Sequence, residues 1–95
     1  MEFRIDVSKL SEEDENYPEL LKDFLRDRTN VVVEASKAEV TLTFEKGEES
    51  LARPKRIRQL LRKFIHKRDL KGDFRVVAGG ENAFVIRRRR SRESE

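Results

Sequence analysis

The sequence predicts a small α+β domain, a two-layer sandwich in which two helices pack on one face of a mainly antiparallel sheet. Three observations lead to this fold class. Short stretches with apolar residues at every second position predict strands that each have one buried face. Two longer stretches carry apolar residues three and four positions apart, as helices with one buried face do. Along the chain these stretches follow the order β-α-β-β-α-β-β.

The first half of the chain contains a strand, a helix and a hairpin. Residues Phe3–Val7 alternate apolar and charged side chains, which predicts the first strand. A helix is predicted over Pro18–Arg28, because proline suits a first turn and apolar residues then recur at helical spacing. The polar and acidic segment Ser8–Tyr17 is expected only to connect the two. Two runs rich in β-branched residues, Val31–Ala35 and Glu39–Glu45, predict a hairpin.

The second half of the chain contains a helix and another hairpin. The helix begins near Pro54, and we expect it to end around Asp69 to Gly72, where Gly72 can adopt the left-handed conformation that stops helices. Strands are predicted over Phe74–Ala78 and Ala83–Arg88, with a glycine-containing turn between them.

Length and composition indicate one soluble domain. A chain of 95 residues is too short for two typical domains, so we expect a single domain over residues 1–88 and a flexible arginine-rich tail over residues 89–95. The sequence has no cysteine, and it has no apolar run near the roughly 18 residues that a membrane span needs. We therefore expect a cytoplasmic protein, and a monomer when it is free.

The most informative segment is the basic helix within Arg53–Lys71, which has nine Lys or Arg residues and one acid, Asp69. Its apolar stripe, predicted to anchor the helix to the sheet, consists of Ile57, Leu60, Leu61, Phe64 and Ile65. One flank of its polar face carries Lys55, Arg58, Arg62 and His66, and the other carries Arg56, Lys63 and Lys67. Like charges four positions apart destabilise an isolated helix. This cost predicts a polyanionic partner that supplies the missing counter-charge.

The distribution of charge supports a nucleic-acid partner. Residues 1–50 hold 14 acids and 7 bases, whereas residues 51–95 hold 15 bases and 5 acids. A polyanion would therefore meet the second half of the chain and be repelled by much of the first. A second basic cluster follows the last strand and would extend the contact; its members are Arg87, Arg88, Arg89, Arg90 and Arg92.

The few aromatic residues favour structured RNA over single strands. There is no Trp, the single Tyr17 lies in the acidic half, and the six Phe residues occupy positions predicted to be buried. Recognition through phosphates and shape suits helical RNA, and arginine binds phosphates in a bidentate manner. Charge alone is also compatible with duplex DNA, but no helix-turn-helix, zinc-finger or zipper pattern is present.

The sequence contains no residue pattern typical of a catalytic site. The only histidine, His66, lies among cations and has no cysteine to pair with, so neither a Cys/His nucleophile nor a histidine metal cluster can form. The pair Gly79-Gly80 lies between two strands and indicates a turn, not a phosphate-binding loop. Glu45, Glu48 and Glu49 match no metal-binding spacing, and solvated charge explains them better. We expect no catalytic residue, no metal and no cofactor.

The run KRIRQLLRKFIHKRDLKGDFRVVA and the returning strand AFVIRRR resemble the eukaryotic-type L-twenty-two family of large-subunit ribosomal proteins. The order of elements upstream also matches, and the most specific part is FRVVA just after the basic helix. The resemblance implies a structural ribosomal protein that binds ribosomal RNA and lies beside other ribosomal proteins. The RNA contacts would then fall on Lys55, Arg56, Arg58, Arg62, Lys63, Lys67, Arg68 and Arg75.

The chain departs from that family at both ends, and other functions stay open. The family has a lysine-rich N-terminal extension and a long acidic C-terminal tail, whereas this sequence has an arginine cluster followed by RESE. The alternative is an interaction module outside the ribosome that binds other structured RNA, an acidic protein or an anionic membrane. Docking on a protein or membrane would require the apolar stripe of the basic helix to be exposed.

Overall fold

The computed structural model describes residues 1–48, 53–70 and 72–89, which form an α+β domain with a five-stranded mixed sheet. In chain order the described elements are β1 (Glu2–Asp6), α1 (Ser8–Glu13), α2 (Tyr17–Thr29), β2 (Val32–Ala35), β3 (Glu39–Thr43), α3 (Pro54–Lys67), β4 (Phe74–Ala78) and β5 (Ala83–Arg88). The α+β class is confirmed. The strands β4 and β5 have the predicted bounds, and the other predicted strands and α2 differ from prediction by one or two residues at their ends.

The sheet has the order β2-β3-β1-β5-β4, with β1 at its centre. Three of the strand pairs are antiparallel, and β1 and β5 are parallel. Within β1, Ile5 lies opposite Val40 of β3 on one side and opposite Phe84 of β5 on the other. The first and last strands of the domain are therefore direct neighbours.

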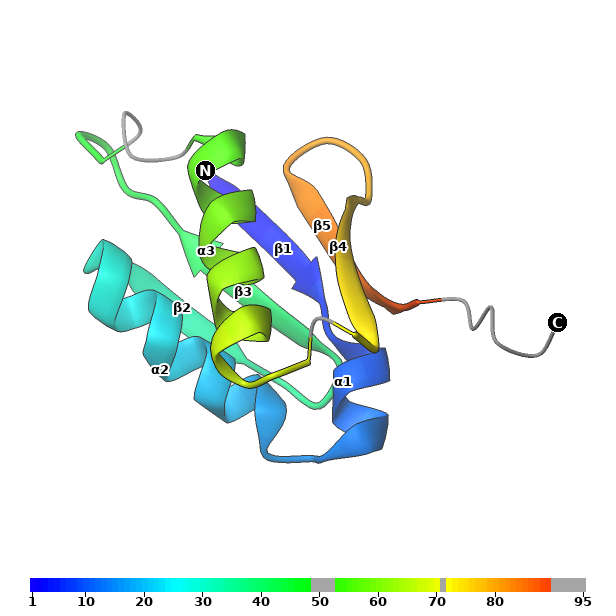
Figure 1. Cartoon of the computed structure of the whole chain (residues 1–95). Coiled ribbons are helices and arrows are strands. Elements are labelled where there is room, and N and C mark those ends of the chain that lie inside the picture. Colours follow the sequence, from blue (N-terminus) through cyan, green and yellow to red (C-terminus); the bar gives the residue numbers. More distant parts are fainter. Residues whose placement is uncertain (49–52, 71, 90–95) are drawn as a thin grey trace, which may run out of the picture.

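One face of the sheet forms the core. The apolar residues of each strand, such as Phe3 and Ile5 in β1, are buried, whereas their charged neighbours Glu2, Arg4 and Asp6 are exposed. The helices α2 and α3 lie over the same face of the sheet (Figure 1) and contribute their own buried residues to the core. This arrangement follows from the period-two pattern, since alternate side chains of a strand point to opposite faces.

The helix α1 is missing from the predicted order, which treated Ser8–Tyr17 as a connection. It has six residues and buries only Leu10, so its apolar pattern is too short to be recognised. The carboxylate of Asp6 accepts hydrogen bonds from the Ser8 backbone N–H (3.0 Å) and hydroxyl (2.8 Å) just where the helix begins. In the fold α1 packs against β5 and α2.

The prediction that Gly72 stops the basic helix is also wrong. The helix α3 ends at Lys67, and Asp69 adopts the left-handed conformation, with φ 59°. The Leu70 N–H donates to the Ile65 carbonyl and the Asp69 N–H donates to the His66 carbonyl, which is the Schellman pattern. Leu70 is buried, as the apolar residue after such a stop often is. An aspartate tolerates this conformation, so no glycine is needed.

The neighbouring residues Val32 and Val33 test which face of the sheet is covered. Val33 is 7% exposed and Val32 is 51% exposed. We expect Val33→Ala to lower the free energy of unfolding by about 2 kcal/mol, because it removes buried methyl groups. The matched control, Val32→Ala, should change it by about 0.5 kcal/mol or less. Urea denaturation measures both, and equal losses would contradict this assignment of the faces.

Candidate nucleic-acid interface

The helix α3 separates apolar from cationic residues as its sequence predicts. The apolar stripe is buried against the sheet in full; it consists of Ile57, Leu60, Leu61, Phe64 and Ile65. The exposed residues include all the predicted contact residues on or next to the helix, namely Lys55, Arg56, Arg58, Arg62, Lys63, Lys67 and Arg68. Burial of the stripe leaves only the polar side of α3 to meet a partner.

The α3 cations have no carboxylate partners within the described part of the chain. The ion pairs found there lie elsewhere, on β1, α1 and α2 and between Arg88 and Glu13. The helix itself contains no acid from Pro54 to Lys67. Arg58 and Arg62 lie four positions apart, so their positive charges repel each other. The free protein carries this electrostatic cost, and a bound polyanion would remove it.

A groove with a volume of about 760 Å³ lies along α3, and we refer to it as the α3 groove. Residues from α3, from the edge strand β4 and from two other parts of the chain line it. Its cations are Arg28, Arg56, Arg58, Arg62, Lys63, Arg75 and Arg89. His66 also lines it, and no Asp or Glu does. Cations that are distant in sequence thus surround one recess, which concentrates positive potential there.

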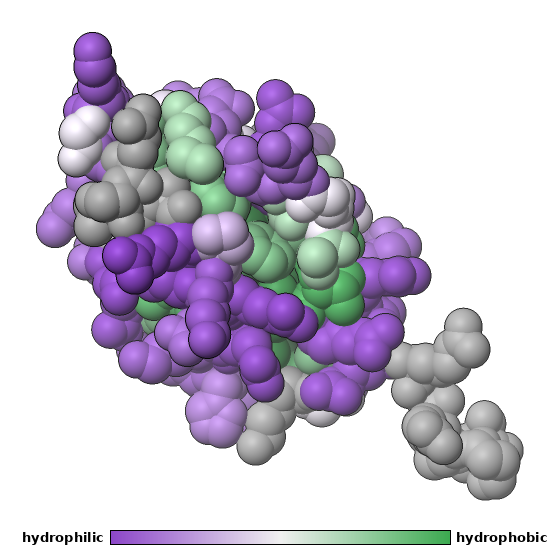
Figure 2. Space-filling view, turned by 90° about the horizontal axis from the view of Figure 1, so that it is seen from above, coloured by the Kyte–Doolittle hydropathy of each residue, from purple (hydrophilic) through white to green (hydrophobic). Residues whose placement is uncertain are grey.

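The surface near α3 is mainly hydrophilic. Figure 2 looks down on the molecule from above Figure 1 and shows hydrophilic residues on either side of a strip of hydrophobic surface. Lys55, Lys67 and Arg68 are exposed but do not line the α3 groove. Six of the predicted contact residues therefore line the α3 groove, namely Arg56, Arg58, Arg62, Lys63, Arg75 and Arg89.

Arg28 is a cation of the groove that the sequence analysis did not identify. Its guanidinium lies 4.7 Å from the centre of the Phe24 ring, and that ring meets Phe64 of α3 edge to face at 5.5 Å. Arg68 lies over the other member of the pair, 5.7 Å from the Phe64 ring centre. The Phe24–Arg28 spacing of one helical turn is the only local signal for this contact.

The C-terminal arginines have different environments. Arg87 is exposed on β5 and lies directly opposite Arg75 of β4. Arg89 lines the α3 groove, and its backbone N–H donates to the Asp73 carbonyl at 2.7 Å. The predicted contact residues Arg90 and Arg92 lie outside the described residues, as does most of the predicted tail.

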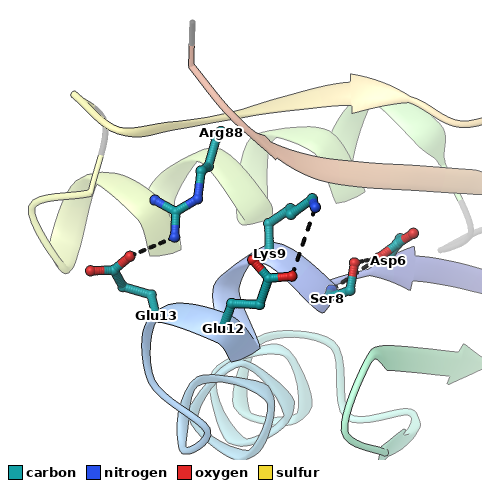
Figure 3. A network of polar contacts seen from close by, with 6 residues as sticks. All are labelled: Asp6, Ser8, Lys9, Glu12, Glu13 and Arg88. Atoms are coloured by element: carbon teal, nitrogen blue, oxygen red, sulfur yellow. Dashed lines mark hydrogen bonds and ion pairs between the residues drawn. The ribbon is translucent and has the colours of Figure 1, made fainter. Parts of the chain in front are cut away.

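Arg88 is held by the N-terminal part of the chain. Its guanidinium donates to the Glu13 carboxylate at 2.8 Å and lies 5.2 Å from the centre of the Phe74 ring. Figure 3 shows this contact beside the Lys9–Glu12 ion pair of α1. The helix α1 thus binds the end of β5, so Arg88 is already paired within the protein, unlike the α3 cations.

The described residues can be compared with the requirements of a metal site and of a membrane span. Across residues 1–48, 53–70 and 72–89, no group of three or more His, Cys, Asp or Glu residues could hold a metal ion. In the same part of the chain, no helix is long and apolar enough to cross a membrane.

The comparisons with known proteins leave the family open. No protein-family model matches this chain, and a search of curated proteins gives no significant match. The resemblance to the eukaryotic-type L-twenty-two family therefore stays a prediction from the residues that carry it.

The substitution Arg58→Glu tests whether the α3 cations repel each other in the free protein. It replaces a like-charged pair with a carboxylate four residues before Arg62, the favourable orientation for a helical ion pair. At low salt we expect the free energy of unfolding to rise by about 0.5 kcal/mol. The gain should shrink at high salt, because salt screens exposed charges.

The control for this measurement is Arg58→Gln, which removes the like charge without adding a carboxylate. Urea denaturation should place its stability between those of the original protein and Arg58→Glu. If Arg58→Glu instead destabilises the protein at low salt, the cations of α3 are balanced within the protein and our electrostatic interpretation is wrong.

Proposed function

We propose that this protein binds structured RNA through the α3 groove, as a component of the large ribosomal subunit. The observation that carries the proposal is a recess lined by six arginines and a lysine, with no carboxylate among its lining residues. The domain would act as a rigid two-layer α+β scaffold for these cations. No catalytic step is involved, and the function is binding.

The side chains in the groove suit phosphate recognition. Guanidinium groups donate two parallel hydrogen bonds to phosphate oxygens, which gives both orientation and affinity. Arginines on α3, on β4 and at the end of α2 approach the groove from different directions, so they would contact phosphates on more than one side of a helical RNA. Shape and phosphate contacts are the main means by which proteins recognise helical RNA.

The aromatic residues do not support a single-strand binder. Five of the six Phe residues are buried, and the sixth, Phe24, is partly buried between Phe64 and Arg28. Proteins that bind single strands without sequence preference stack successive bases on exposed aromatic rings. The burial of these rings therefore favours folded RNA as the partner.

The ribosomal assignment rests on the sequence resemblance and gains one supporting observation. Arg75 belongs to the FRVVA segment, which is the most specific part of that resemblance and forms β4. In the fold this arginine lines the same groove as Arg58 and Arg62 of the basic helix. A ribosomal role implies neighbouring ribosomal proteins as further partners and the cytoplasmic ribosome as the location.

A membrane or protein partner has less support. Such docking would use an exposed apolar face on the basic helix. The stripe from Ile57 to Ile65 is 6% exposed or less at each of its apolar residues. Only electrostatic attraction would then remain to hold an acidic protein or an anionic membrane.

The double substitution Arg62→Glu and Lys63→Glu should weaken RNA binding without unfolding the protein, because both side chains are exposed in the groove. We expect the affinity for a structured RNA to fall by at least about tenfold at physiological salt. The slope of log K against log salt should decrease by roughly two, one for each lost phosphate contact. Filter binding over a salt series measures both quantities.

The control is a double variant with the same change in net charge at two residues that do not line the groove, Arg26→Glu with Lys37→Glu. It should leave the salt slope unchanged. Equal weakening by both double variants would indicate attraction by net charge alone, and binding that does not depend on salt would contradict the proposal.

The ribosomal assignment is tested in the source cells. We expect a tagged copy of the protein to sediment with large ribosomal subunits and to be released by a high-salt wash. A tagged Arg62→Glu, Lys63→Glu protein should remain in the soluble fraction. If the purified protein binds RNA but is absent from purified large subunits, the ribosomal assignment is wrong and the non-ribosomal alternative is supported.

A further inference from the structure

A second groove lies between the first turns of α3 and the turn that joins β4 to β5. It has a volume of about 380 Å³, and we refer to it as the turn groove. Most of its lining is apolar, from Pro54, Ala78, Ala83 and Phe84. Cations enter it only from α3, as Lys55 and Arg58. An apolar recess of this size can take a small flat ligand.

The turn groove and the α3 groove share one lining residue. Arg58 lines both of them, so the two recesses lie next to each other at this residue. A polyanion in the α3 groove would therefore place one of its phosphates beside the opening of the turn groove. A ligand of the turn groove that is attached to an anion would therefore suit this arrangement.

One polar group in the turn groove is suited to recognition. Asn82 is fixed in the left-handed conformation, with φ 55°, and its carbonyl accepts the Arg4 N–H at 3.0 Å. Its side-chain amide makes no hydrogen bond to any described residue. An amide offers a donor and an acceptor together, which matches the edge of a nucleobase.

We propose that the turn groove holds one unpaired nucleobase of the RNA that occupies the α3 groove. The base would contact Pro54, Ala78 and Ala83, with its edge toward the Asn82 amide and its phosphate near Arg58. This inference rests on the proposed function and adds to it a preference for helical RNA that carries a bulged nucleotide.

The preference for an unpaired base follows from the cost of exposing one. A base in an intact helix must lose its pairing and stacking before it can enter a protein recess, whereas a bulged base has no pairing to lose. The apolar lining then gains from covering the base faces, as it does in other RNA-binding proteins that hold splayed bases. An uninterrupted helix would bind through phosphates alone.

Two RNA hairpins that are identical except for a single bulged nucleotide test the inference. We expect the protein to bind the bulged hairpin about tenfold more tightly, because the recess removes apolar surface of the base from water. With 2-aminopurine at the bulge, its fluorescence should change on binding, because the environment of the base changes. The same fluorophore placed within the paired stem should show no such change.

Two substitutions locate the effect in the turn groove. Ala78→Leu should obstruct the recess, and because Ala78 is exposed the domain should still fold. Asn82→Gly removes the amide, and glycine keeps the left-handed backbone. Each should reduce the preference for the bulged hairpin toward onefold and leave the affinity for the paired hairpin unchanged. The matched control, Ala38→Leu, lies in the turn between β2 and β3 and should keep the preference.

The outcomes separate this inference from the proposed function. If the protein binds neither hairpin, the proposed function is wrong. If it binds both equally, or if Ala78→Leu weakens both to the same extent, RNA binding stands and the base site is wrong. Retention of the preference by both groove variants would also overturn the base site.

Discussion

The burial of the apolar stripe of α3 against the sheet is the interaction on which the rest of the surface depends. A helix whose exposed residues are mostly cations, with no acid from Pro54 to Lys67, is poorly stable alone. Five apolar side chains inserted into the core offset that repulsion. The same contacts fix the rotation of the helix, so that its cations face the groove beside β4. The same packing contact therefore anchors α3 to the sheet and orients its cations.

The acids in the first half of the chain pair mainly with bases close to them in sequence. Among the described residues most of their ion pairs are local, within β1, α1 and α2, so these acids neutralise nearby bases and not the α3 cations. The exception is Glu13, which reaches across the fold to Arg88. That contact attaches α1 to β5 at the cost of one potential phosphate contact. Arginines that are adjacent in sequence therefore have different surroundings in the fold.

Most of the fold could be predicted because its patterns are local. Alternation along β4 and β5, and the stripe along α3, identify these elements without reference to the rest of the chain. Two features could not be predicted in this way: α1 shows one buried leucine, and the stop at Asp69 uses a residue that only sometimes adopts positive φ.

The α3 groove was predicted in part, since cations within α3 share the polar face of the helix. Arg28 joins them only through the packing of Phe24 on Phe64, and the turn groove exists only once β4 and β5 lie beside α3.

The parallel pairing of β1 with β5 has a consequence for the synthesis of this protein. Ile5 and Phe84 are neighbours in the sheet, although nearly the whole domain separates them in sequence. During translation β1, β2 and β3 can pair early, but the strands beside α3 emerge last. Until then the cationic helix has no complete core against which to pack. Contacts between such distant segments slow folding, so the nascent helix would carry its positive charge before the strands that anchor it are in place.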